Sequence, residues 1–185
     1  GRRLEFTGSL GWALCGVALL TYAAGPLIGR SSLLGTVVAG LAVVAVIPVF
    51  NRVERHFPDV HMAGLLRCGL GAKLLLTLPR FEGRQDSVDY HRVGARLADS
   101  FRRFDFTVDT GREIPGTGSV RYVTGLVEVL TFEDEFATFV IFSLAGFVGL
   151  AAFVLAFRVG LPEIDTTRYA VLVLFLSLIH ISEPT

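Results

Sequence analysis

Two uncharged stretches decide the fold: Gly8 to Gly29, GSLGWALCGVALLTYAAGPLIG, and Ser31 to Asn51, SSLLGTVVAGLAVVAVIPVFN, which only Arg30 separates. A helix needs about 20 apolar residues to cross the hydrocarbon core of a bilayer, and each stretch has roughly that length. A helix also satisfies its own backbone hydrogen bonds in lipid. The two stretches therefore predict a membrane hairpin within an all-α integral membrane protein.

The composition agrees with a membrane protein. Of the 185 residues, 52% are hydrophobic and only 18% are charged, against about 25% charged in soluble domains. The formal net charge is zero, so there is no basic excess of the kind that nucleic-acid surfaces show, and we expect no nucleic-acid partner. Cys15 and Cys68 lie inside apolar runs without metal-binding spacing, which predicts reduced, inert thiols.

Three further segments extend the membrane part. His61 to Pro79 is apolar but contains Arg67 and Lys73, so this third segment either faces a bundle interior or lies in the membrane interface. Phe136 to Phe157 carries no charge and predicts a span. A fifth segment begins near Tyr169. We therefore expect a polytopic helical bundle of about four to five spans in the plasma membrane.

These segments divide the chain into four parts. Residues 1–79 and 136–176 are membrane segments, residues 80–135 form a polar loop, and residues 177–185 look like translated sequencing-adapter sequence, which predicts a non-native tail. The chain begins without Met and stops in an apolar segment, so we expect a fragment.

The polar loop lies on one side of the membrane or the other depending on whether the third segment spans the bilayer. Arginines at the amino end favour a cytoplasmic start. If the third segment spans the bilayer, parity places the loop outside the cytoplasm, whereas an interfacial third segment leaves it inside. The loop contains eight Arg and eleven Asp or Glu, but charge orients long loops poorly. We expect an extracytoplasmic loop.

Two amphipathic surface helices are predicted in this loop. Apolar residues recur at steps of three and four in the first, Ser87 to Phe104, namely Tyr90, Val93, Leu97, Phe101 and Phe104. The second, Ser119 to Phe132, has Val120, Val123, Leu126, Val127 and Leu130 on one side. Amphipathic helices of this kind lie along a membrane with the apolar side dipped into the headgroup boundary.

Acidic side chains and an imidazole come together at the predicted start of the first loop helix. Asp86 and Asp89 are three residues apart, and Tyr90 and His91 follow directly. The amino end of a helix carries partial positive charge, which keeps carboxylates ionised and attracts phosphate oxygens. An ionised carboxylate there is suited to take a proton from a sugar hydroxyl. The candidate catalytic residues are therefore Asp86, Asp89 and His91.

Nearby side chains supply candidate substrate-binding groups. Guanidinium groups pair with phosphate oxygens, which suggests Arg80, Arg84 and Arg92 for the phosphate of a lipid-linked donor. Tyr90 joins them as an aromatic residue suited to the membrane interface.

Other interpretations of this cluster stay open. An Asp at the N-cap with an acid three residues later is also the ordinary start of a helix. Asp86, Asp89 and His91 also suit a divalent cation, but their spacing matches no strong metal signature. We therefore expect no metal and no cofactor.

Two motifs carry a resemblance to known families: Asp86 to Gly94, DSVDYHRVG, and Gly116 to Arg121, GTGSVR. From about Arg80 to Arg168 the chain resembles polytopic membrane proteins of actinobacteria, and more distantly the first long loop of GT-C glycosyltransferases and EpsG-like polysaccharide polymerases. In the GT-C superfamily such a loop carries an acidic catalytic base, often near a Tyr, and the donor is a polyprenyl-phosphate sugar. The resemblance implies Asp86 or Asp89 as that base.

The position of the loop departs from that family. GT-C enzymes usually place it after their first span, whereas here it follows an apparent third. The first hypothesis is a membrane glycosyltransferase or polysaccharide polymerase of cell-envelope glycan assembly, with the bilayer and a polyprenyl-phosphate-linked sugar as partners. A transporter or flippase-like protein with Arg67 and Lys73 along an anion pathway is a second hypothesis, and a non-catalytic membrane scaffold is a third.

Overall fold

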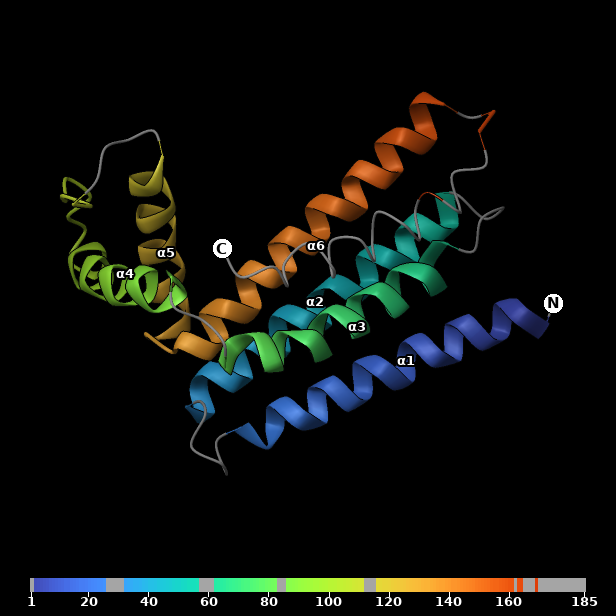
Figure 1. Ribbon diagram of the computed structural model, residues 1–185, viewed down its shortest axis with the longest axis horizontal. Coiled ribbons are helices and arrows are strands. Elements are labelled where there is room, and N and C mark those ends of the chain that lie inside the picture. Colours follow the sequence, from blue (N-terminus) through green and yellow to red (C-terminus); the bar gives the residue numbers. More distant parts are fainter. Residues whose placement is uncertain are drawn as a thin grey trace. The chain divides into compact units, whose positions relative to one another are not determined.

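The computed structural model describes residues 2–25, 32–56, 62–82, 86–111, 116–161, 163–164 and 169. Within these ranges the regular structure is all helical, which confirms the predicted class (Figure 1). The helices are α1 (Arg2–Ala23), α2 (Leu33–His56), α3 (Met62–Glu82), α4 (Asp86–Arg102), α5 (Thr117–Thr131) and α6 (Glu135–Gly160).

Two helices in the described part of the chain are long and apolar enough to cross a membrane. They are Leu33–Val53 within α2 and Glu135–Gly160, which is α6. Both coincide with spans that the sequence predicts. α1 contains a shorter apolar stretch, Leu10–Ala23, and α3 carries Arg67 and Lys73.

The larger predicted number of spans is not confirmed. Within the described residues, α1 ends at Ala23, and α3 is not among the candidate spans in the described ranges. Of the predicted fifth span only Tyr169 is described, and the predicted tail, residues 177–185, lies outside the described residues.

The chain forms two compact units, and each is described by itself. The first comprises Gly1–Leu20, Val43–Thr77 and Ser143–Thr185, so it contains parts of α1, α2, α3 and α6. Within it the rings of Phe50 and Phe147 pack edge to face with centroids 5.9 Å apart, which joins α2 to α6.

Within the first unit α1 and α3 approach closely at two glycines. A Cβ added to Gly11 would lie 2.7 Å from the Cβ of Arg67, and one added to Gly71 would lie 2.5 Å from the Cβ of Leu14. Small residues at such points allow helices to pack closely in membranes. Cys15 and Cys68 are buried, and neither forms a disulfide among the described residues.

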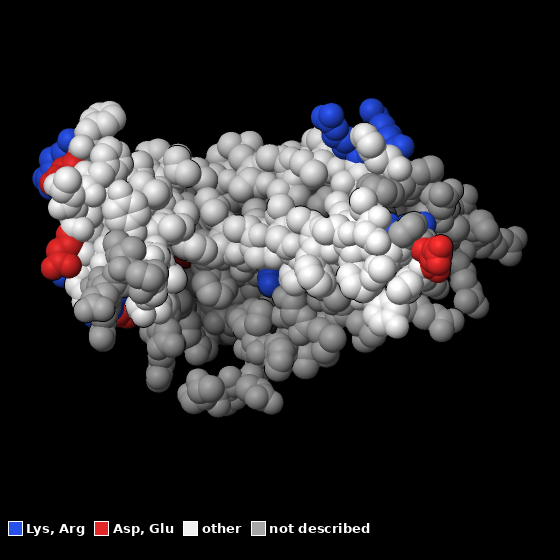
Figure 2. All heavy atoms as spheres, turned by 90° about the horizontal axis from the view of Figure 1, so that it is seen from above, with Lys and Arg blue, Asp and Glu red and all other residues white. Residues whose placement is uncertain are grey.

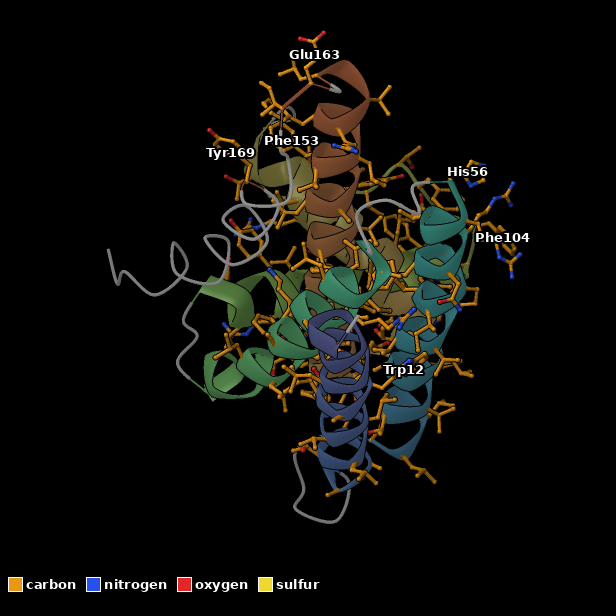
Figure 3. All side chains as sticks on the ribbon, turned by 90° about the vertical axis from the view of Figure 1, so that its right-hand side faces the viewer. Trp12, His56, Phe104, Phe153, Glu163 and Tyr169 are labelled. Carbon is orange, nitrogen blue, oxygen red and sulfur yellow. The ribbon has the colours of Figure 1, made fainter. Side chains whose placement is uncertain are left out.

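Large side chains project from the apolar helices of the first unit. Trp12 on α1 and Phe153 on α6, both labelled in Figure 3, are about half exposed. Among the residues that Figure 2 draws in colour or white, most on this face are uncharged. A soluble core would cover side chains of this kind.

The second unit comprises Thr21–Ala42 and Leu78–Phe142. One carboxylate joins two helix starts in it. Asp134 is the N-cap of α6 and accepts a hydrogen bond from the backbone N–H of Ala137 at 2.8 Å, while its other oxygen accepts the N–H of Ser32 at 2.5 Å. Ser32 in turn caps α2 through the N–H of Gly35 at 2.9 Å. The first turns of α2 and α6 are therefore adjacent.

α4 and α5 pack against each other within the second unit (Figure 1). Their boundaries agree with the predicted helices to within two residues at each end. Val93, Leu97 and Phe101 of α4 are buried, and the ring of Phe101 lies 4.9 Å from that of Tyr122 on α5. The apolar side of α4 was expected to dip into the headgroups, and this expectation is wrong because α5 covers it.

The buried and exposed residues of α5 are distributed unusually. Its buried positions are small or polar, namely Gly118, Thr124, Gly125, Glu128 and Thr131. The apolar side predicted from the sequence is the exposed one, with Val120, Val123, Leu126 and Leu130 all more than a third exposed.

The Asp134 contacts predict a stability effect. Asp134→Ala removes one acceptor from two helix starts, so we expect the free energy of unfolding to fall by about 2 kcal/mol, roughly one for each lost cap. Thermal and denaturant unfolding of the detergent-solubilised chain measures the change. Asp134→Asn is the matched control, because an amide oxygen still caps one helix, and its loss should be smaller. Equal losses of stability in the two variants would contradict the interpretation that one carboxylate caps both helices.

Candidate functional site

The second unit contains a pocket of about 190 Å³ between α4, α5 and the first turns of α6. Aromatic and aliphatic side chains make up most of its wall, and a few polar groups interrupt them. The lining residues are Tyr90, His91, Val120, Thr124, Glu135, Thr138, Phe139 and Phe142. An apolar pocket with a small number of converging polar groups is the usual form of a ligand site.

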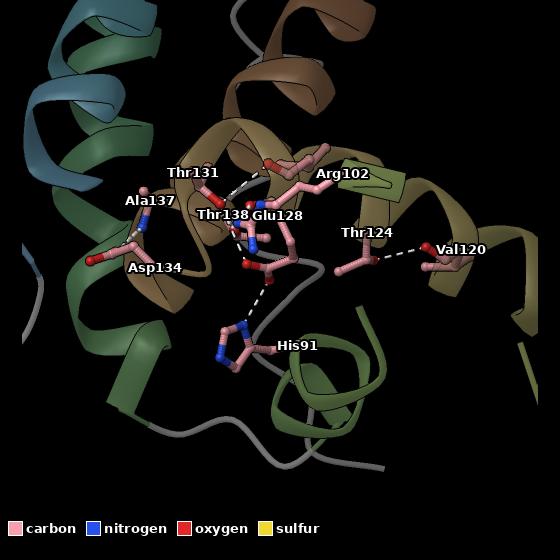
Figure 4. Close-up of polar contacts among 10 residues, drawn as sticks. His91, Arg102, Val120, Thr124, Glu128, Thr131, Asp134, Ala137 and Thr138 are labelled. Atoms are coloured by element: carbon pink, nitrogen blue, oxygen red, sulfur yellow. Dashed lines mark hydrogen bonds and ion pairs between the residues drawn. The ribbon is translucent and has the colours of Figure 1, made fainter. Parts of the chain in front are cut away.

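An imidazole and a buried carboxylate meet at this pocket. His91 Nδ1 lies 2.7 Å from Glu128 Oε1, and the side chain of Glu128 is fully buried while that of His91 is 24% exposed (Figure 4). An ionised carboxylate can only accept a hydrogen bond, so this contact favours the tautomer with the proton on Nδ1. In the neutral ring, Nε2 is then the acceptor, and it lies on the ring edge away from Glu128.

The second oxygen of Glu128 continues the network into α6. The hydroxyl of Thr131 donates to Glu128 Oε2 at 3.4 Å, and the hydroxyls of Thr131 and Thr138 lie 2.7 Å apart (Figure 4). A buried carboxylate is costly unless hydrogen bonds satisfy it. These contacts therefore fix Glu128, and Glu128 fixes the ring of His91.

The backbones of α4 and α5 approach closely at two glycines. A Cβ added to Gly94 would lie 2.7 Å from Thr124, and one added to Gly125 would lie 2.7 Å from the Cβ of Leu97. α4 and α5 form a helical hairpin, and at its far end Arg102 forms an ion pair with Glu133. The glycines therefore allow the two helices to come close enough for His91 to reach Glu128.

Asp89, one of the two carboxylates suggested as a base, is held by an arginine. Its Oδ2 accepts a hydrogen bond from Arg121 at 2.6 Å, and its side chain is 54% exposed. Arg121 also donates to the carbonyl of Thr110 at 3.1 Å. Asp89 does not line the pocket, whereas its neighbours Tyr90 and His91 do.

The other predicted residues fall at different places. Asp86 begins α4 as expected, and its side chain lies outside the described residues, as do the side chain of Arg80 near the end of α3 and all of Arg84. Arg92 is exposed on α4 and does not line the pocket. Of the seven candidates, the described structure therefore brings Tyr90 and His91 together at the pocket.

A second recess of about 520 Å³ lies between α4, α5 and the segment that follows α4. Arg96 and Arg121 line it, together with Asp105 and Asp109. The Thr107 hydroxyl, and then the Thr107 backbone N–H, donate to Asp105 and hold the pKa of that carboxyl below its usual value, so Asp105 is ionised at neutral pH. Two positive and two negative groups balance, and the recess does not concentrate anions.

The most buried member of the site was missed in the sequence. Glu128 stands in GLVEVLT, residues 125–131, among aliphatic neighbours. A lone acid inside an apolar helical stretch is rarely buried without a partner, and this signal pointed to a polar contact. His91 as the partner, 37 residues away, cannot be read from local sequence.

No protein-family model, curated protein or solved structure matches this chain. In the described residues no group of three or more His, Cys, Asp or Glu is arranged to hold a metal ion. The arguments below therefore depend on the geometry of the second unit.

The His91–Glu128 contact predicts the protonation pattern of the imidazole. Above the pH at which His91 loses its charge, the ring should carry its proton on Nδ1, the less common tautomer of a free imidazole. Nitrogen NMR of the chain with labelled histidine measures this. In Glu128→Leu we expect the proton to move to Nε2 because the acceptor is gone. An unchanged tautomer in that variant would show that Glu128 does not orient the ring.

Proposed function

We propose that this chain is part of a membrane glycosyltransferase or polysaccharide polymerase in which His91 accepts the proton of the attacking sugar hydroxyl. The donor is a polyprenyl-phosphate-linked sugar. The observation that carries this proposal is the 2.7 Å contact between His91 and the fully buried Glu128 at the wall of an apolar pocket. A carboxylate that fixes the tautomer of a histidine orients the ring and stabilises the imidazolium that forms when the second ring nitrogen takes a proton.

The pocket suits one part of an amphiphilic donor. Its apolar wall, which includes Phe139 and Phe142, favours hydrocarbon, while His91 and Glu135 present polar atoms. Sites that enclose a whole drug-sized ligand usually exceed about 300 Å³. At about 190 Å³ this pocket accommodates only the part of a lipid-linked sugar nearest the reacting bond.

The two candidate spans support a place in the membrane. Only 28% of the apolar window of each is buried within the chain, whereas the core helix of a soluble protein is mostly buried. The plasma membrane is the proposed location.

The Asp134 contacts support a multi-pass arrangement. Ser32 and Ala137 bind one carboxylate, so α2 and α6 begin on the same side of the membrane. The chain must return to that side between the end of α2 and the start of α6, and α3 is the helix that can make the return. With a cytoplasmic amino end, α4 and α5 then lie outside the cytoplasm.

This topology predicts the accessibility of the loop helices. A cysteine introduced at exposed Asp99 should react with a membrane-impermeant maleimide added to intact cells. A cysteine at Arg55, near the end of α2, should react only after the membrane is permeabilised. Reaction of both positions from the same side would contradict the proposal that α3 crosses the membrane between α2 and α4.

The catalytic proposal predicts a difference between two variants. His91→Asn keeps a side-chain N–H close to the position of Nδ1 and thus the contact with Glu128, but it lacks Nε2. We expect transfer from polyprenyl-phosphate sugars in membranes to fall by at least about 100-fold, the usual contribution of a general base. Asp89→Asn should retain most activity, because it weakens only an exposed ion pair.

Two controls make this result decisive. Asp99→Asn, on the exposed side of α4, should match the unchanged chain, and membrane insertion should be equal in all variants. Full loss in Asp89→Asn or Asp86→Asn with an active His91→Asn would instead support an acidic base. Full activity in all three variants would exclude catalysis by this cluster.

A further inference from the structure

The two helices of the hairpin expose opposite kinds of side chain. On α4, from Val88 onward, every exposed residue is charged: Asp89, Arg92, Arg96, Asp99 and Arg102. On α5 every exposed residue after Thr117 is aliphatic: Val120, Val123, Leu126 and Leu130. The hairpin therefore has a charged side and an aliphatic side.

Polar groups of α5 are turned inward instead. Thr124, Glu128 and Thr131 are buried, and Glu128 is bound to His91 and Thr131. A helix in water buries its apolar side and exposes its polar side. In α5, Tyr122 and Val129 pack partly against α4, but three polar residues are buried and four aliphatic residues are exposed. An apolar medium over the aliphatic side would stabilise this arrangement.

The neighbouring helix identifies that medium. Only Phe132 to Asp134 separate α5 from α6, a helix long and apolar enough to cross a membrane. Leu130 is 63% exposed and Phe132 is 56% exposed directly before this helix. The aliphatic side of α5 therefore lies next to the start of the candidate span along the chain.

We propose that the aliphatic side of α5 is in contact with the hydrocarbon and headgroup boundary of the bilayer, while α4 faces water. Lipid is favoured over a protein partner because the exposed side of α5 has no charged residue to set the register or orientation of such a partner, and because it adjoins α6. The charged side of α4 is suited to the aqueous phase.

The pocket gains an entrance from this arrangement. Val120 belongs both to the aliphatic side of α5 and to the pocket wall. An acyl or isoprenyl chain can therefore pass from the bilayer to the pocket beside Val120. This entrance depends on the proposed function, whereas the contact of α5 with lipid does not.

Spin labelling in liposomes tests the contact. Cysteine variants at Val123 and, separately, Leu126 are labelled with a nitroxide after Cys15 and Cys68 are replaced by Ala, and Asp99 on α4 is the matched control. The full chain is reconstituted in phosphatidylcholine and phosphatidylglycerol. Oxygen concentrates in lipid, whereas a water-soluble nickel chelate stays outside. We expect the oxygen-to-nickel collision ratio at positions 123 and 126 to exceed that at 99 several-fold.

Two outcomes would overturn the proposal. High accessibility to nickel at positions 123 and 126 would place α5 in water. Exclusion of both reagents would show that protein, either a second copy or another part of the full chain, covers the aliphatic side. The assay uses no substrate, so its failure is distinct from a failure of the glycosyltransferase proposal.

Discussion

The second unit depends on the carboxylate of Asp134. It accepts backbone N–H groups from the beginnings of two apolar helices, Ser32 before α2 and Ala137 in α6. Gly35 leaves the room that this carboxylate occupies, because a Cβ there would overlap the Asp134 side chain. Helix starts leave several N–H groups without partners, and an apolar medium makes that deficit expensive. One acid therefore binds one backbone N–H at each of two helix starts and holds them beside each other.

From this point the turn into α6 positions the pocket. Phe132 and Glu133 both have positive φ, 56° and 62°, an uncommon conformation for residues with a side chain. The Glu133 N–H donates to the Glu128 carbonyl at 3.1 Å, and Arg102 binds the Glu133 carboxylate. The backbone and the side chain of Glu133 thus both hold this uncommon turn in place. This turn positions Thr138 of α6 beside the polar network of α5.

Local pattern predicted the helices well and their surroundings less well. The limits of α4, α5 and α6 follow from hydropathy and spacing, which act over a few residues. Periodicity identified the apolar side of α4 but could not identify what covers it. We expected lipid to cover this side, whereas α5 does. Likewise the Asp89 contact with Arg121 spans 32 residues. Such pairings depend on the close approach of α4 and α5 at Gly94 and Gly125. Local sequence does not predict that approach.

Glu128 also constrains the order in which the protein is assembled. An acid without a partner is costly in an apolar medium, and the principal partner of Glu128, His91, belongs to the preceding helix. The nascent α5 therefore gains by pairing with α4 before it settles on lipid. We therefore expect biogenesis in two stages, in which α6 enters the bilayer by its own hydrophobicity and α4 and α5 reach the membrane surface already paired.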